Sequence, residues 1–177
     1  MAKRGYHGTG IKEIVDTAEV PKGSFYNYFK SKEDFGIEIV RCHSTEFWQA
    51  WAECFDHKCD NPIEALRNCF GKMLVDYEEC SVWAFCIVGI LAAEMCETSK
   101  ICRITMHEVI NEWRNNLAAH IRKAQELGIA RSDVSAEDLA TLFWAAWQGS
   151  LVRVKIENST APVKQCFTLM FDRIMSK

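Results

Sequence analysis

The sequence contains little proline and glycine, with three prolines and nine glycines among 177 residues. Sheet-rich folds need frequent turns, and turns depend on these two residue types, so their scarcity favours helices. Long apolar runs are also missing, since the longest, residues 82–93, is too short to cross a bilayer. Residues 1–10 lack the apolar stretch of an export signal. We therefore expect a helical, cytoplasmic protein with no membrane partner.

The nine cysteines are odd in number and irregular in spacing. In a chain without an export signal, this pattern indicates reduced thiols and not a disulfide framework. Cys54, His57 and Cys59 lie close in sequence but lack the paired C-x-x-C spacing of a metal site. A chain of this length can bury a full core unaided. We predict no metal and no cofactor.

The net charge of -3 is unevenly distributed along the chain. Residues 1–32 contain six lysines and arginines against three acidic residues, a balance of +3, whereas the remainder has 15 against 21, a balance of -6. A basic N-terminal part on an acidic body indicates contact with a polyanion. Chance unevenness in a short window explains the same numbers, so sequence motifs are needed to decide between it and contact with a polyanion.

Helix start and stop signals recur along the chain. Thr9 can cap a first helix, Ser31 to Asp34 resembles a capping box, and Gly128 can end a helix. We expect helices over about 10–18, 22–29, 32–55, 62–79, 82–97, 100–127, 136–157 and from 162 to the end. No strand-length alternating segment occurs, so the predicted fold class is all-α, with an N-terminal helix-turn-helix domain before a larger helical domain.

The first two expected helices and their tight connection have the pattern of a helix-turn-helix, and a long helix follows them. In the connection, residues 17–21, small Ala18 permits close packing and Val20 can point into the core. Phe25 and Phe29 are four residues apart in the second helix, so both can face inward.

The opposite face of the second helix carries groups that suit DNA, and Asn27 projects from it. Lys22 can donate to guanine O6 or N7 at the helix end that meets base edges. The hydroxyls of Tyr26 and Tyr28 suit phosphate oxygens, and Lys32 begins the next helix, where a positive helix end favours phosphate. A solvated charged face above an aromatic core explains the same spacing.

The identities of the residues favour DNA binding. Residues 9–15 (Thr-Gly-Ile-Lys-Glu-Ile-Val) and 18–35 (Ala-Glu-Val-Pro-Lys-Gly-Ser-Phe-Tyr-Asn-Tyr-Phe-Lys-Ser-Lys-Glu-Asp-Phe) closely resemble the DNA-binding signature of the tetracycline-repressor (TetR/AcrR) family of transcriptional regulators. The resemblance implies a homodimer that binds a double-stranded operator through residues 1–34 and has a regulatory and dimerisation domain over residues 35–177. The implied DNA contacts, together with the outward-facing Asn27, are Thr9, Lys22, Gly23, Ser24, Tyr26, Tyr28 and Lys32.

One part of the family pattern is missing. Members have an amphipathic helix before the motif that packs under the helix pair, whereas here residues 2–4 could form only its tail. Without that helix, Ile11, Val15, Phe25 and Phe29 would be exposed. We expect that the sequence lacks native N-terminal residues; the alternative is a chain damaged as a repressor.

The last two expected helices correspond to the dimer interface that the resemblance implies. Apolar residues run down both helices, and small residues such as Ala145 and Gly149 would let helices approach closely. An intramolecular core accounts for some of the same positions. The expected interface, a two-fold arrangement of four helices, uses Phe143, Trp147, Ser150, Phe167, Met170, Phe171 and Ile174.

The expected signal is a small apolar molecule or a thiol-reactive compound. Residues 86–99, with Lys155 later, resemble the NemR-like, electrophile-sensing branch of the family, in which a cysteine matching Cys96 senses electrophiles or oxidants near a lysine matching Lys155. Cys96, Cys86 and Lys155 are therefore candidate sensors, with buried inert cysteine as the alternative. Candidate lining residues of an apolar cavity are Trp83, Trp113, Trp144 and Trp147, although aromatic residues at helical spacing more often form the core.

Two other functional classes compete with a DNA-binding regulator. A thiol enzyme that consumes peroxides or electrophiles would need a cysteine oriented by a base, and no Cys/His pair has convincing context. A helical module that only dimerises would bind no DNA. The sequence favours a non-enzymatic repressor with an unidentified small-molecule or electrophile inducer.

Overall fold

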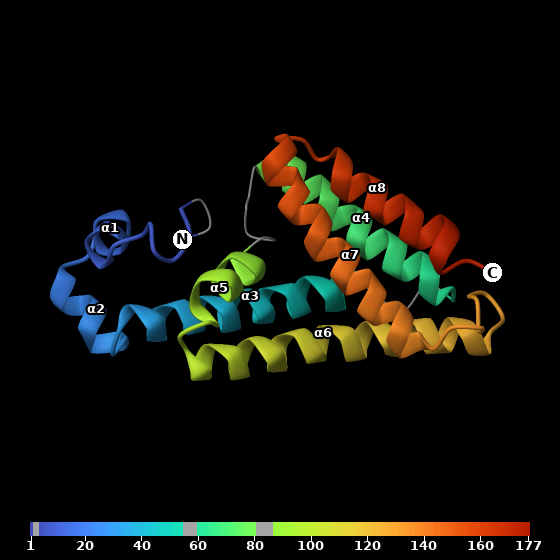
Figure 1. Cartoon of the computed structure of the whole chain (residues 1–177), viewed down its shortest axis with the longest axis horizontal. Helices are drawn as coiled ribbons and strands as arrows, with labels where there is room; N and C mark the ends of the chain where they lie inside the picture. Colours follow the sequence, from blue (N-terminus) through green and yellow to red (C-terminus); the bar gives the residue numbers. More distant parts are fainter. Residues whose placement is uncertain (2–3, 55–59, 81–86) are drawn as a thin grey trace. The chain divides into compact units, whose positions relative to one another are not determined.

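The computed structural model describes residues 1, 4–54, 60–80 and 87–177, and its fold is all-α (Figure 1). The helices are α1 (Ile11–Thr17), α2 (Lys22–Tyr28), α3 (Lys32–Cys54), α4 (Pro62–Cys80), α5 (Ile87–Met95), α6 (Lys100–Glu126), α7 (Ala136–Glu157) and α8 (Ala161–Leu169), which continues as a π-helical turn, Met170–Ile174. Within the described ranges no strand forms, although Ala130 and Ser176 make an isolated β-bridge. The expected fold class is confirmed.

Side-chain caps explain where several helices begin. The Ser31 hydroxyl accepts a hydrogen bond from the Asp34 N–H at 3.1 Å, and the Asp34 carboxylate accepts one from the Lys30 N–H at 3.0 Å. Asn61 Oδ1 accepts bonds of 3.0 and 3.2 Å from two N–H groups in the first turn of α4. Ser135 Oγ caps α7 in the same way, at 3.0 Å. These are the groups that a helix N-terminus leaves unpaired.

Thr9 does not cap α1, and this expectation is wrong. The N-cap is Gly10, and no side chain bonds to the first turn. Thr9 is buried instead, and its hydroxyl donates to the Gly5 carbonyl at 2.8 Å. Because Gly5 has a positive φ of 74°, which glycine adopts without steric cost, the chain can fold back tightly before α1.

The connection between α1 and α2 is a Schellman motif. The Glu19 N–H donates to the Asp16 carbonyl at 3.3 Å, the Val20 N–H donates to the Val15 carbonyl at 3.0 Å, and Glu19 has the left-handed φ of 55°. Pro21 then starts α2 as its N-cap. Val20 is 42% exposed, so its expected place in the core was wrong.

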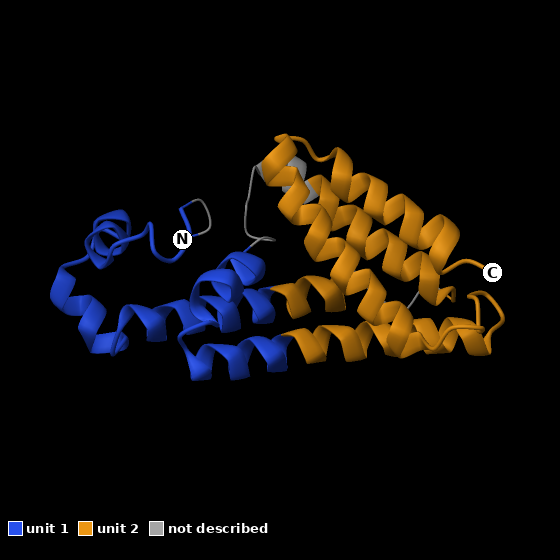
Figure 2. Cartoon of the chain, viewed as in Figure 1, with its two compact units in different colours: residues 1–46, 83–109 blue, residues 47–82, 110–177 orange. Residues whose placement is uncertain are grey.

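The chain divides into two compact units (Figure 2). The first unit is residues 1–46 and 83–109, so it contains α1, α2, the first part of α3, α5 and the start of α6. The second unit is residues 47–82 and 110–177 and contains α4, α7 and α8. The predicted domain boundary at residue 34 stays a prediction.

An aromatic cluster forms the core of the second unit. The rings of Phe70 and Phe143 lie 4.7 Å apart, those of Phe70 and Trp147 5.2 Å apart, and those of Phe143 and Phe171 5.7 Å apart. All four side chains are buried, so the cluster joins α4, α7 and the turn after α8. Edge-to-face pairs at these distances add to the free energy of apolar burial.

Candidate DNA-binding surface and sensor residues

The helix-turn-helix is held together by an aromatic triad. The ring of Phe25 lies 5.3 Å from Phe29 and 5.6 Å from Phe35, and Phe29 lies 4.9 Å from Phe35. Phe25 is buried, as is Val15 on α1. This packing fixes the inner face of α2 and directs the opposite face outward, as the sequence predicts.

The outward face of α2 presents polar and aromatic groups to solvent. Tyr26 is 53% exposed and Tyr28 80% exposed, although tyrosine rings are ordinarily at least half covered. Lys22, Gly23 and Asn27 are exposed beside them, and Ser24 is half-buried. A methyl group added at Gly23 would meet no described atom within 4 Å, so this end of α2 leaves room for close backbone approach.

Lys32 lies at the start of α3, where the helix end is positive. Its ammonium sits 4.3 Å from the centre of the Tyr6 ring, a cation–π contact. Burial raises the pKa of Tyr6, with smaller contributions from Glu33 and Cys102, so the Tyr6 ring stays neutral beneath Lys32. The contact holds Lys32 in place for the predicted phosphate contact, whereas the buried Thr9 hydroxyl is occupied by its own chain.

Five of the seven expected interface residues are buried within a single chain: Phe143, Trp147, Ser150, Met170 and Phe171. Phe167 and Ile174 are half-buried. The Ser150 hydroxyl donates to the Trp147 carbonyl at 2.7 Å and so stays within α7. Buried side chains offer little surface to a second copy. These five residues therefore fit the alternative that the sequence left open, in which they belong to an intramolecular core.

The candidate aromatic lining residues do not form one group. The rings of Trp113 and Trp144 lie 4.7 Å apart, and Phe47 stacks on Trp113 at 4.4 Å. Trp147 belongs to the Phe70 cluster instead, and Trp83 lies outside the described residues. Trp113 and Trp144 thus remain together as candidates for ligand contact.

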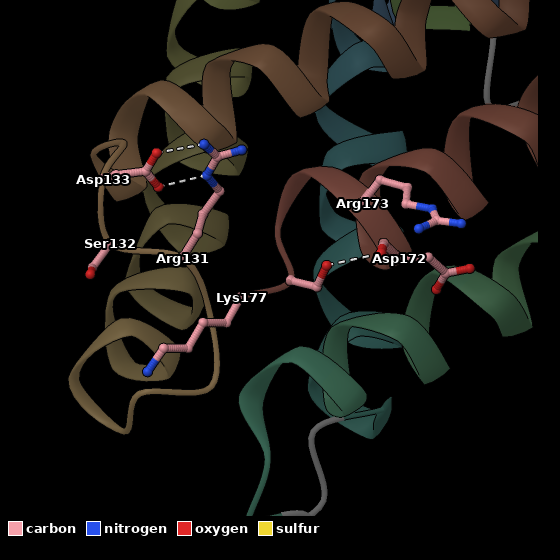
Figure 3. Close-up of a pocket in the computed structure, with 7 residues that line it drawn as sticks. Arg131, Ser132, Asp133, Asp172, Arg173 and Lys177 are labelled. Carbon is pink, nitrogen blue, oxygen red and sulfur yellow. Dashed lines mark hydrogen bonds and ion pairs between the residues drawn. The ribbon is translucent and has the colours of Figure 1, made fainter.

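A polar pocket of about 600 Å³ lies near the C-terminal end of the second unit (Figure 3). Its charged groups are partly paired with one another, since the Arg131 guanidinium donates to both Asp133 oxygens at 2.7 and 2.6 Å and lowers the pKa of Asp133. No candidate tryptophan or cysteine lines it. The lining residues are Arg131, Ser132, Asp133, Asp172, Arg173, Ser176 and Lys177.

Among the candidate sensors, Cys96 follows α5 directly and is half-buried in the first unit. Its sulfur lies 3.7 Å from the sulfur of Cys102, which is not one of the predicted sensor residues. Lys155 is an exposed residue of α7 in the second unit, and Cys86 lies outside the described residues. Ser99, which caps α6, marks in the sequence where that helix begins, but no sequence signal shows that α5 ends before Cys96.

In the described part of the chain, no cluster of three or more His, Cys, Asp and Glu side chains is arranged to hold a metal ion. No helix in the same ranges is long and apolar enough to span a membrane. The weak metal candidate over residues 54–59 lies outside the side chains that the structure describes.

The chain belongs to the TetR family of bacterial regulatory proteins. Residues 1–39 match the model "Bacterial regulatory proteins, tetR family", and residues 62–170 match "Tetracyclin repressor-like, C-terminal domain". It is thus a helix-turn-helix DNA-binding transcriptional regulator, and regulators of this family bind operator DNA and act as dimers with small-molecule inducers.

Individual relatives support the same assignment. The transcriptional repressor DhaR of Mycobacterium sp. (strain GP1) is 30% identical over 98% of this chain and 85% of its own length. The crystal structure of a regulatory protein TetR from Rhodobacter sphaeroides has a TM-score of 0.89 at 31% identity, covering 98% of this chain and 92% of that one. The reduced form of Escherichia coli NemR has a TM-score of 0.83 at 26% identity, covering 96% and 88%.

Proposed function

We propose that this protein is a repressor that reads its operator with the exposed face of α2. The observation that carries the proposal is the pair of exposed tyrosines, Tyr26 and Tyr28, beside Lys22 on the second helix of a helix-turn-helix. Lys22 reads a base at the N-terminal end of α2, and the tyrosine hydroxyls and Lys32 bind phosphates. The protein acts by binding and not by catalysis, in the cytoplasm, where chromosomal DNA lies.

The test is equilibrium binding to DNA from upstream of the protein's own gene. Fluorescence anisotropy should show an affinity at least about 10³-fold higher than for a scrambled duplex of equal length, because specific and non-specific complexes differ by that factor or more. Raising the salt concentration should weaken both complexes as counterions are released. Equal affinity for every promoter fragment and the scrambled duplex would contradict operator recognition.

We further propose that a second copy covers the exposed apolar face of α7. Three residues of this face are large, apolar and 49% to 76% exposed: Leu142, Val152 and Ile156. Exposed Ala145 and Gly149 lie between them, and all five alternate at spacings of three and four residues, which suits antiparallel or crossing helix pairs. Small residues at the centre allow two helices to approach closely, and dimerisation would present two copies of α2 to two half-sites.

Val152→Glu is expected to convert the dimer into monomers, raising the dimer dissociation constant roughly hundredfold or more because an unpaired carboxylate would be buried. Sedimentation equilibrium measures this constant directly. Leu127→Glu is the matched control, since Leu127 is 55% exposed but follows α6 instead of lying on α7. Unchanged association of the Val152 variant would remove this face of α7 from the interface.

The inducer that releases the repressor is proposed to be a small apolar molecule or a thiol-reactive compound. Support for the first comes from the stacked Phe47–Trp113 pair and the edge-to-face Trp113–Trp144 pair in the second unit. Support for the second comes from Cys96 and from the likeness to NemR. Burial lowers the pKa of His120, next to Trp51, so at neutral pH this aromatic region is uncharged at that position and suited to an apolar ligand.

A further inference from the structure

Two thiols face each other across the connection between α5 and α6. The Sγ atoms of Cys96 and Cys102 are 3.7 Å apart. Cys102 is 1% exposed, whereas Cys96 is half-buried and open to solvent on one side. The pair therefore has one accessible sulfur and one sheltered sulfur in contact with it.

Backbone contacts hold this connection in one conformation. The Cys102 N–H donates to the Ser99 hydroxyl at 3.0 Å, which caps α6. The Arg103 guanidinium donates to the Cys96 carbonyl at 2.6 Å and closes the end of α5. The two sulfurs are therefore kept adjacent by the fold, and a short displacement at the end of α5 brings them to bonding distance.

The environment of Cys102 keeps its thiol protonated. Burial, the hydrogen bond with Cys96 and the neighbouring carboxylate of Glu33 raise the pKa of Cys102 to about 12, against a smaller lowering by Arg103. Cys102 therefore keeps its proton at neutral pH. Because the thiolate is the reactive form and Cys102 is both protonated and buried, the solvent-accessible Cys96 is the sulfur that meets an oxidant first.

The residue two positions before Cys96 contacts the segment that leads into the helix-turn-helix. Glu94 Oε2 accepts a hydrogen bond from the His7 N–H at 2.7 Å, and the His7 ring lies within 3.2 Å of the Glu94 carbonyl. The same carboxylate fills the space where a side chain on Gly5 would be, since a Cβ there would lie 2.0 Å from Oε1. The end of α5 thus holds the turn that precedes α1.

Met95, directly before Cys96, makes a second connection. It is 2% exposed, and its Sδ and Cε atoms would lie 3.0 Å from a Cβ added to Gly36 of α3. Tyr6 also lies close to Gly36, and its ring supports Lys32. All these residues belong to the first unit, so the thiol pair shares one compact body with the DNA-binding helices.

We propose that Cys96 and Cys102 form a reversible disulfide on reaction with hydrogen peroxide or an organic hydroperoxide, and that this disulfide lowers operator affinity. The second half rests on the proposed function. The site differs from the predicted pairing of Cys96 with Lys155, because both reacting groups lie in the unit that contains the helix-turn-helix.

The chemistry balances in two steps. The Cys96 thiolate attacks one peroxide oxygen, so an S–O bond forms, the O–O bond breaks, and water or an alcohol leaves after taking up a proton. Cys102 sulfur then attacks Cys96 sulfur, so the S–S bond forms and the S–O bond breaks. Hydroxide leaves with the Cys102 proton as water, and in total the two thiols lose two electrons to the peroxide.

Bond formation displaces the end of α5. The sulfurs must approach from 3.7 Å to the disulfide length of about 2.05 Å, and Met95 and Glu94 are joined to Cys96 through the backbone. Tightly packed interiors transmit such shifts. The bonds from Glu94 to His7 and the packing of Met95 on Gly36 are therefore altered, which repositions α1 and Lys32 relative to α2.

Peptide mapping tests the chemistry. After hydrogen peroxide and alkylation, trypsin cleavage at Lys100 separates the two cysteines, so a disulfide should join peptide 101–103 to the peptide ending at Lys100, with fragmentation placing the bond at Cys96. In Cys102→Ser, dimedone should instead trap a sulfenic acid at Cys96. Cys42→Ser, which removes an exposed cysteine of the same unit, should behave as wild type. A bond to another cysteine, or no bond, would overturn the proposal.

Operator binding tests the consequence. The oxidised wild type should bind its operator about tenfold or more weakly than the reduced protein, the size of an ordinary coupling between sites, and dithiothreitol should restore affinity. Cys102→Ser and Cys102→Ala should not show this dithiothreitol-reversible loss. Equal affinities of the reduced and mapped, oxidised wild type would refute the coupling. Failure of the reduced wild type to bind any operator would count instead against the proposed function, since the mapping needs no DNA.

Discussion

Lys22→Ala should weaken binding to the operator by about 1–3 kcal/mol, or roughly 5- to 150-fold, with little change in binding to a scrambled duplex. The reason is positional: Lys22 is exposed at the N-terminal end of α2, where its ammonium can bond to guanine O6 or N7. Fluorescence anisotropy on both duplexes separates base reading from phosphate binding. If Lys22 contacts only phosphate, Lys22→Ala should weaken binding to both duplexes alike and reduce the salt slope by about one.

Two variants sharpen this experiment. Lys72→Ala removes an equal charge from an exposed site on α4 in the second unit and should leave operator affinity unchanged. Gly23→Ala should fold normally, because the added methyl group meets open space, yet should weaken operator binding if DNA approaches the backbone there. Operator affinity unaffected by the Lys22 substitution would remove Lys22 from the recognition surface.

Phe143→Ala should lower the free energy of unfolding by about 3–5 kcal/mol. Phe143 is 1% exposed, and its ring contacts Phe70, Trp147 and Phe171. Truncation to alanine leaves a cavity, because these three large neighbouring rings cannot move enough to fill the space. Urea denaturation at a fixed protein concentration, followed by circular dichroism, gives the difference in unfolding free energy.

The comparison variant is Val75→Ala, on the exposed side of α4. Val75 is 51% exposed, so its truncation should change the unfolding free energy by no more than about 0.5 kcal/mol. If Phe143→Ala left stability intact but dissociated the dimer, Phe143 would be an interface residue after all, and the assignment of its ring to the intrachain core would be incorrect.

The sequence predicted the helices well because their ends are chemically marked. Ser31, Asn61 and Ser135 bond to the first turns that follow them, and Gly128 ends α6 with a positive φ of 69°. Such signals act over three or four residues, so they are visible without knowledge of the fold. The prediction fails at Thr9, because its hydroxyl donates to a carbonyl four residues earlier instead of bonding to the turn that follows.

The candidate sites were harder to predict because helical spacing does not say what covers a face. Phe143 and Leu142 are adjacent and equally apolar, yet one lies in the aromatic core and the other is 49% exposed. Their burial differs because α4 packs against the side of α7 that carries Phe143. The pairing of Cys96 with Cys102 likewise depends on how α5 turns into α6, which no periodic pattern encodes.

The Schellman motif between α1 and α2 has a consequence for how such a protein can diversify. Its two defining hydrogen bonds join main-chain atoms, from Glu19 to Asp16 and from Val20 to Val15, and use no side chain. The angle between the two helices is therefore independent of most side-chain chemistry in the turn. Substitutions on α2 can change which DNA sequence is read while the scaffold that presents them is inherited unaltered.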